Sequence, residues 1–222
     1  MLKKLLSLVC IAARIVIVLY PTVKDRYEMY EQQQILAQWE HDLQRLNDIA
    51  PEPEATADIR LPLAVETGAP AAAEEEKPAE PQPQDSRLKN VEGVLKIDKI
   101  NLNLPILTDA TVKNLQLSVA SIANTGKPGE IGNYAIAGHR NLTYGKNFNR
   151  LDELSVGDVI EVDTKTRQYR YQVEEKQYVL PEEVWVLEGN GKDRNIVLVT
   201  CHPIDTGTHR LIVKGKLLEN KG

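Results

Sequence analysis

Cysteine is scarce in this chain, which has only Cys10 and Cys201 among its 222 residues. Cys10 lies inside a strongly apolar N-terminal segment, so Cys201 has no intrachain disulfide partner if that segment is a membrane anchor. An unpaired thiol is a liability in an oxidising compartment, and its retention there suggests chemistry. The ordinary alternative is a buried cysteine that acts as a small hydrophobic side chain. The residues around Cys201 distinguish a reactive thiol from a packed, inert cysteine.

The chain also lacks an excess of basic residues and a second long apolar run. Its formal net charge is −5 at pH 7, which gives no electrostatic footprint for nucleic acid. The apolar run Leu5–Tyr20 is interrupted by Ser7 and Arg14, follows two lysines, and is not followed by a small-residue cleavage site. We therefore expect residues 1–23 to form an uncleaved single-pass membrane anchor, with the rest of the chain on the extracellular side.

Two segments of contrasting composition follow the apolar run. Residues 24–50 are expected to form a juxtamembrane helix, which we interpret as a solvated stalk; a short self-associating coil is the alternative. Residues 51–87 are acidic, rich in Pro, Ala and Glu, and poor in large apolar residues. Such a segment cannot offset its ordering entropy, so it is expected to be an extended linker that holds a domain away from the membrane. The apolar residues of the helix, on heptad-like spacing, are Met29, Leu36, Trp39, Leu43, Leu46 and Ala50.

Residues 88–222 have the pattern of a mainly β domain. Thr111–Ile122 has apolar residues at helical spacing and polar residues that can cap a helix. Short strands joined by turn residues, with one or two short helices, predict a single barrel domain of about 135 residues. Strands are predicted at 91–100, 102–107, 133–137, 158–163, 169–178, 196–201 and 210–218.

A thiol nucleophile needs a neighbouring base or cation, and the β domain offers three histidines. His202 is adjacent to Cys201, so in a continuous strand the two side chains point to opposite faces. His209 has the same conflict with Arg210, which opens the last strand. A hairpin over residues 202–209 would set Arg210 beside Cys201 on the neighbouring strand. His139 follows a predicted strand in Gly138-His139-Arg140 and is free to approach from elsewhere in the fold.

These residues resemble the signature of the sortase family. Val197-Leu198-Val199-Thr200-Cys201 is similar to the sortase sequence threonine-leucine-any-threonine-cysteine, with valine in place of the first threonine. Gly138-His139-Arg140 matches the histidine segment of sortases, and Arg210 falls where their essential arginine follows the cysteine. Further agreement comes from 148–151, 154–158 and 171–173, so the resemblance spans roughly Val91–Leu218. Cys201-His202-Pro203 and the N-terminal anchor are most similar to class D sortases.

The resemblance implies a closed sortase-type β-barrel and a cysteine transpeptidase. Cys201 would attack the Thr–Gly or Thr–Ala bond of an LPxTG-like sorting signal on a secreted protein. His139 would act as general acid and then base, Arg210 would help to hold the oxyanion, and Thr200 would help to shape the substrate pocket. The thioester would pass to an amine of a cell-wall peptidoglycan precursor or another amine acceptor.

These residues require no cofactor and no metal. Some sortases use calcium, but Asp152, Glu153 and Asp158 are interpreted as turn and surface residues, not as a ligand cluster. Two other functions remain open: a secreted cysteine peptidase that hydrolyses its substrate, and an anchored β-barrel binding module with an inert cysteine. A peptidoglycan L,D-transpeptidase is disfavoured, because the chain lacks a Ser-His-Gly-Cys-type motif.

Overall fold

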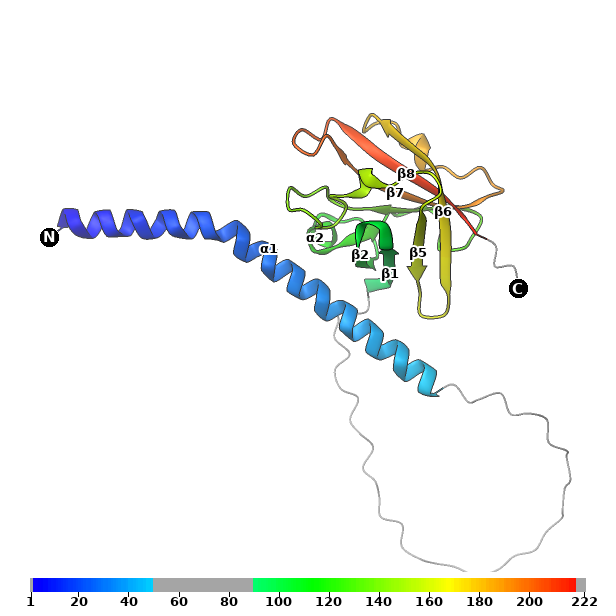
Figure 1. The fold of residues 1–222 in the computed structure, drawn as a ribbon, viewed down its shortest axis with the longest axis horizontal. Coiled ribbons are helices and arrows are strands. Elements are labelled where there is room, and N and C mark those ends of the chain that lie inside the picture. The colour runs from blue at the N-terminus through cyan, green and yellow to red at the C-terminus, as the bar shows by residue number, and fades with distance from the viewer. Residues whose placement is uncertain (1, 50–89, 219–222) are drawn as a thin grey trace, which may run out of the picture.

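A computed structural model describes residues 2–49 and 90–218 of the chain. The predicted linker, 51–87, lies outside the described residues. The described part contains one long helix, α1, and a barrel domain joined to it in sequence through the undescribed segment (Figure 1). The helices are α1 (Leu2–Ile49), α2 (Val112–Leu117) and the short 3₁₀ helices η2 (Asp98–Ile100), η3 (Leu151–Glu153) and η4 (Val184–Leu187). The strands are β1 (Val91–Ile97), β2 (Leu102–Leu107), β3 (Val119–Ser121), β4 (Gly132–Ala137), β5 (Val159–Asp163), β6 (Gln168–Val179), β7 (Arg194–His202) and β8 (His209–Leu217).

The strands close into a barrel in the order β1-β2-β3-β4-β7-β8-β6-β5. Neighbours pair antiparallel except β2 with β3 and β4 with β7, which pair parallel. Alternate residues of each strand point inward. The inward set forms one apolar core that includes Leu95, Ile106, Tyr134, Leu198 and Leu211. The predicted mainly β barrel is therefore confirmed.

Most of the expected strands lie where the alternation predicted them, and one was missed. The residues 111–122 were expected to be one helix, but α2 ends at Leu117 and Val119–Ser121 forms β3. Thr111 caps α2, because its side chain accepts a hydrogen bond from the Asn114 N–H. The helix stops there because Val119 and Ala120 pair in parallel with Ile106 and Leu107 of β2, and the helical spacing did not show that pairing.

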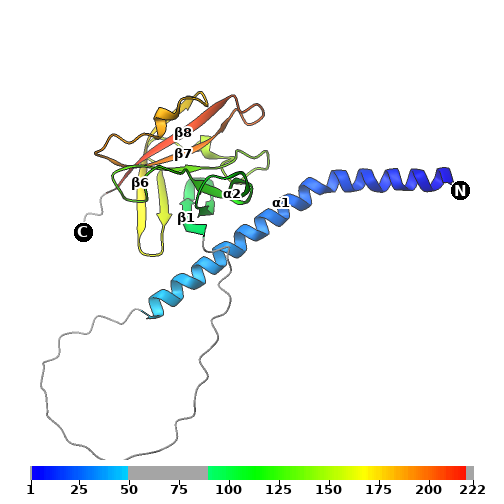
Figure 2. The same ribbon diagram turned by 180° about the vertical axis from the view of Figure 1, so that it is seen from behind.

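Helix α1 is not the solvated stalk that we expected. Its second half lies against the barrel beside β1 and α2 (Figure 2). Ile35 and Trp39 are 1 % and 2 % exposed, and they form a second apolar cluster with Val91, Val94 and Leu107. The heptad-like spacing therefore marks a face that packs on the outside of the barrel, since outward-pointing residues of β1 and β2 are apolar there.

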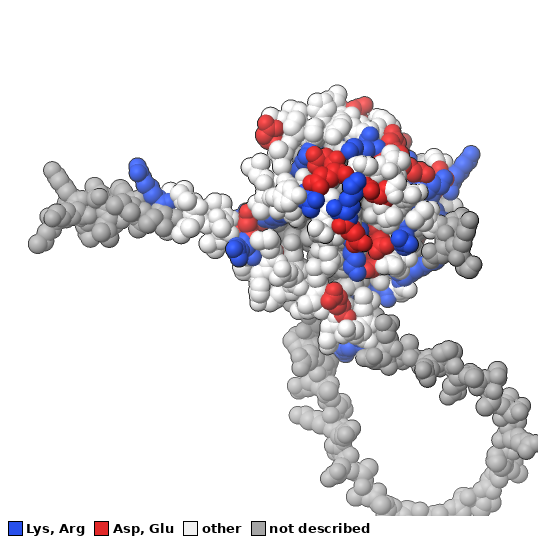
Figure 3. Space-filling view, viewed as in Figure 1, with Lys and Arg blue, Asp and Glu red and all other residues white. Residues whose placement is uncertain are grey.

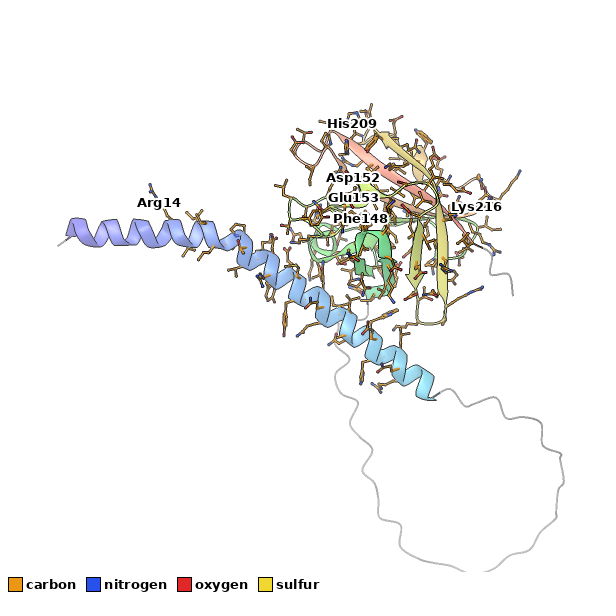
Figure 4. All side chains as sticks on the ribbon, viewed as in Figure 1. Arg14, Phe148, Asp152, Glu153, His209 and Lys216 are labelled. Atoms are coloured by element: carbon orange, nitrogen blue, oxygen red, sulfur yellow. The ribbon has the colours of Figure 1, made fainter. Side chains whose placement is uncertain are left out.

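The first half of α1 extends away from the barrel, and Arg14 projects from it (Figure 4). Pro21 lies inside the helix. The helix changes direction in its blue portion (Figure 1), as expected where a proline removes one backbone hydrogen bond. Within the described residues, no helix is both long and apolar enough to cross a membrane. The predicted anchor at 1–23 stays a prediction.

Acidic and basic side chains are interleaved on the barrel face shown in Figure 3. Several of them form ion pairs between neighbouring segments, such as Lys96 with Asp163 and Lys99 with Asp158, each at 2.7 Å. Exposed pairs of this kind contribute about 0–1 kcal/mol each. Stability of the barrel thus rests on its apolar interior and its closed ladder of backbone hydrogen bonds.

Candidate active site

Cys201 and Arg210 lie opposite each other on β7 and β8. The odd-numbered residues Val197 and Val199 of β7 belong to an apolar cluster on the outside of the barrel, together with Ile212 of β8. Strand alternation extends this outer face to Cys201 and Arg210. Cys201 is half-buried, so the thiol is partly open to solvent. The predicted hairpin placement of Arg210 beside Cys201 is confirmed.

The parallel pairing of β4 with β7 positions the segment that carries His139. Ala137 pairs with Val199, and the Gly138 N–H donates to the Val199 carbonyl at 3.1 Å. Gly138 faces the interior, where a Cβ would meet the Phe148 ring at 2.6 Å. His139 is the second residue after the end of β4, and it is exposed. Cys201 and Arg210 therefore lie opposite each other, and His139 follows the strand that pairs with β7.

Thr200 lies on the opposite, inward side of β7. Its side chain is 2 % exposed, and its hydroxyl donates to the Gly138 carbonyl at 2.8 Å. This bond joins the residue before Cys201 to the residue before His139. The contact supports a role in fixing the spacing of the two strands, whereas the role predicted for Thr200 at the substrate pocket stays a prediction.

The Arg210 guanidinium is tied to the loop between β7 and β8. Its Nη1 donates to the carbonyls of Gly207 at 3.0 Å and His209 at 3.1 Å. Gly207 has φ +60° and lies over the thiol residue, since a Cβ there would be 3.6 Å from the Cys201 Cβ. Neither Nε nor Nη2 of Arg210 has a hydrogen-bond partner among the described residues, which leaves these two donor groups for a bound anion or oxyanion.

The other two histidines contact different groups. The His202 ring is 2.6 Å from Arg140 Nη1 and stacks on Tyr178 with ring centroids 4.3 Å apart. His209 lies at the start of β8, as Figure 4 shows, and its Nδ1 is 3.0 Å from the Thr208 hydroxyl. His202 therefore points to the face away from Cys201, as predicted. The contact of Arg140 with His202 was not predicted from the sequence, in which Arg140 is only the third residue of the Gly138-His139-Arg140 motif.

Helix α1 forms one wall of a cavity beside His139. The cavity has a volume of about 490 Å³ and is lined from α1 by Tyr20, Pro21, Lys24, Asp25 and Glu28 and from the barrel by Gln116, His139, Asn141 and Lys146.

Buried Lys146 fixes α1 to the barrel at this cavity. It bonds to Asp25 at 2.7 Å and also to Glu28. Burial alone would lower the pKa of Lys146, but the hydrogen bonds to Asp25 and Glu28 raise it above the usual lysine value. Hydrogen bonds from Lys146 and Thr143 lower the pKa of Asp25. The segment that follows His139 in sequence is thus held by α1.

In the described ranges, 2–49 and 90–218, no group of three or more His, Cys, Asp or Glu side chains is arranged to hold a metal ion. Asp158 bonds to Lys99 and to the Ser155 N–H, and the Lys99 hydrogen bond lowers its pKa against the effect of burial. Glu153 bonds to Arg150, which likewise lowers its pKa. These acidic residues act as turn and surface groups with basic partners.

The fold is a closed β-barrel in which Cys201 lies opposite Arg210, and His139 follows the end of the strand that pairs with the cysteine strand. Residues 95–218, more than half of the chain, match the sortase domain. The chain belongs to the sortase family, whose members are cysteine transpeptidases.

The relatives agree with this membership. The chain is 35 % identical to Sortase A of Bacillus anthracis over 133 residues, which cover 60 % of this chain and 62 % of that protein. Sortase C1 from Streptococcus agalactiae superposes with a TM-score of 0.57 at 32 % identity, over 60 % of this chain and 70 % of that one. A Clostridium perfringens Sortase D5 transpeptidase superposes with a TM-score of 0.54 at 34 % identity, over 58 % and 79 %. The chain thus spans about three fifths of the length of the Bacillus anthracis relative, and a class D sortase is among the solved structures that it resembles.

Proposed function

We propose that this chain is a sortase-type cysteine transpeptidase that transfers secreted proteins to a cell-surface amine. The observation that carries the proposal is the register of β4, β7 and β8. It sets Cys201 opposite Arg210 and pairs the end of β4, two residues before His139, with β7. This register supports His139 as the third member of the site. A nucleophile, a proton carrier and a cation for a developing oxyanion are the parts that acyl transfer needs.

In the proposed reaction the Cys201 thiolate attacks the carbonyl carbon of threonine in an LPxTG-like signal. The C–N bond after threonine breaks, His139 gives a proton to the leaving amine, and a thioester on Cys201 remains. An incoming amine then attacks the thioester, His139 takes its proton, and the Cys201 thiolate leaves as the new amide forms. The Nε and Nη2 groups of Arg210 would donate to the carbonyl oxygen while it carries negative charge.

The proposed partners follow from the family. The protein substrates would be secreted proteins with an LPxTG-like sorting signal, and the acceptor would be an amine of the cell-wall peptidoglycan precursor or another amine. The apolar run at 5–20 supports a membrane anchor with the barrel on the extracellular side. Membrane extraction and protease access to the barrel in intact cells test this placement, and release of the intact chain by alkaline carbonate contradicts it.

A panel of sorting peptides, each given with an amine acceptor, tests the chemistry. Mass spectrometry of the intact protein is expected to detect an acyl group on Cys201 and a ligated peptide in solution. We expect Cys201→Ala to abolish the acyl-enzyme, and His139→Ala and Arg210→Ala to reduce turnover by about 10²-fold or more. His209→Ala is the matched control, because Thr208 is the hydrogen-bond partner of its ring among the described residues.

The same experiment separates the alternatives. Normal ligation by Cys201→Ala refutes the assignment of the nucleophile. Release of free acid without ligated product, at saturating amine, identifies a peptidase instead. An inert binding module would form no acyl-enzyme, and sorting peptide would not protect its partly exposed thiol from iodoacetamide, whereas the thiol of the proposed nucleophile is protected by peptide.

A further inference from the structure

Arg140 is a buried charged side chain for which the reaction described above has no use. Its side chain is 8 % exposed and comes from the segment that follows β4, directly after His139. Its Nη1 lies 2.6 Å from His202 Nδ1, and its Nη2 lies 2.7 Å from Asp152 Oδ2. A buried guanidinium is costly unless its donors are satisfied. These two contacts satisfy Nη1 and Nη2, whereas the buried Nε of Arg140 has no hydrogen-bond partner among the described residues.

The two contacts join three segments that are far apart in sequence. Arg140 follows His139, His202 follows Cys201 and ends β7, and Asp152 lies in η3. The Tyr178 ring of β6 also contacts the His202 ring, with a tilt of 45° between the two planes. Consecutive Cα atoms are about 3.8 Å apart, so the Arg140–His202 contact lies one residue from the proposed nucleophile, Cys201, and one residue from the proposed proton carrier, His139.

The polarity of the contact defines the form of His202. A guanidinium can only donate hydrogen bonds, so Nδ1 of His202 must accept and carries no proton. The ring proton is then on Nε2, and the ring is neutral. In this form His202 accepts a hydrogen bond from Arg140. It cannot also act as the base for the Cys201 thiol, because the thiol lies on the opposite face of β7.

We propose that Arg140 is a positioning residue for the transfer reaction, which links His202 and Asp152 so that His139 and Cys201 keep one relative geometry. The inference rests on the proposed function. It assigns His202, the histidine nearest to the nucleophile in sequence, as the neutral acceptor of this link. Displacement of a reacting group by about 1 Å can cost about 10²-fold in rate, so loss of the link affects the rate constant more than substrate affinity.

The first test measures the ring nitrogens of His202 by ¹⁵N NMR in the unmodified full chain at neutral pH. The expected result is a neutral ring protonated on Nε2, with Nδ1 as acceptor. A ring protonated on Nδ1 overturns the proposal whether or not the protein transfers peptides. The outcome of this measurement therefore does not depend on whether the protein is a transpeptidase.

The second test is kinetic. Arg140→Gln and His202→Phe each remove one side of the contact, and His202→Phe keeps a ring against Tyr178. We expect kcat for peptide transfer to fall about 10-fold to 100-fold in both, with KM changed less than about twofold. His202→Asn places an acceptor oxygen near the position of Nδ1 and is expected to recover most of the loss.

Arg150→Gln is the matched control, because Arg150 also forms an ion pair on η3, with Glu153, but contacts neither β7 nor His139. It is expected to leave kcat unchanged. The double variant Arg140→Gln with His202→Phe should be no slower than either single variant, since both break the same link. Unchanged kcat in folded Arg140→Gln, or losses that multiply in the double variant, would falsify the positioning role.

Discussion

The docking of α1 on the barrel predicts a specific effect of Ile35→Ala. Ile35 is 1 % exposed and packs in the cluster that contains Trp39 and Leu107. Truncation of a buried isoleucine to alanine costs about 2–5 kcal/mol, which includes the cavity that it leaves. Since about 1.4 kcal/mol corresponds to a factor of ten, the docking equilibrium should weaken by about 30-fold to several thousand-fold.

Trp39 itself reports the docking. It is 2 % exposed, whereas Trp185, the other tryptophan, is 55 % exposed, so Trp185→Phe leaves an emission signal from the helix alone. In this background, a urea titration of Ile35→Ala is expected to show the red shift of Trp39 emission at a lower urea concentration than the parent. Val23→Ala, an exposed position on the same helix, is the control. An unchanged midpoint in Ile35→Ala refutes the packing of α1 on the barrel.

Three further perturbations follow from the geometry. The pKa of Asp25 is lowered, so its bond to Lys146 stabilises docking of α1 at a pH above the pKa of the free carboxyl, and this stabilisation is lost as the pH falls through the lowered pKa. The urea midpoint of Trp39 emission should therefore decrease between about pH 6 and about pH 3, and it should decrease less in Asp25→Asn. Gly207→Ala and Gly191→Ala, at φ +60° and +71°, should each lower the melting temperature because left-handed strain costs about 1–2 kcal/mol, but only Gly207→Ala should slow iodoacetamide labelling of the thiol. Thr200→Val should lower the free energy of unfolding by about 1–3 kcal/mol and reduce kcat at constant KM; a rise in KM alone would instead favour direct contact with substrate.

The barrel was predictable because its strands carry a local signal. Alternation of apolar residues marked seven of the strands, and the hairpin at 202–209 placed Arg210 beside Cys201. Strand β3 has three residues, and its parallel partner β2 lies across a helix in sequence. Its strand conformation comes from that pairing and not from its own pattern.

The contacts that were missed all depend on groups brought together by folding. The apolar spacing in α1 was visible in the sequence. The surface on which α1 packs is formed by outward-pointing residues of β1 and β2, and outward positions of a barrel strand are expected to face solvent unless another element covers them. The contacts of Arg140 could not be predicted for the same reason. Its two acceptors are on Asp152 and His202, and no sequence spacing relates these residues to Arg140. Sequence periodicity defines the face of an element, and only the fold defines what that face meets.

The parallel pairing of β4 with β7 also determines when, during folding, the proposed site can form. Thr200 and Gly138 form a hydrogen bond across 62 residues of sequence. The end of β4, which precedes His139, therefore lies beside the end of β7, which contains Cys201, only after the two strands have paired. Contacts of such separation form late, because the intervening chain loses entropy before they stabilise anything. A chain in which β4 and β7 have not yet paired therefore lacks the arrangement on which the proposed role of Cys201 depends, so formation of the proposed site is coupled to completion of the fold.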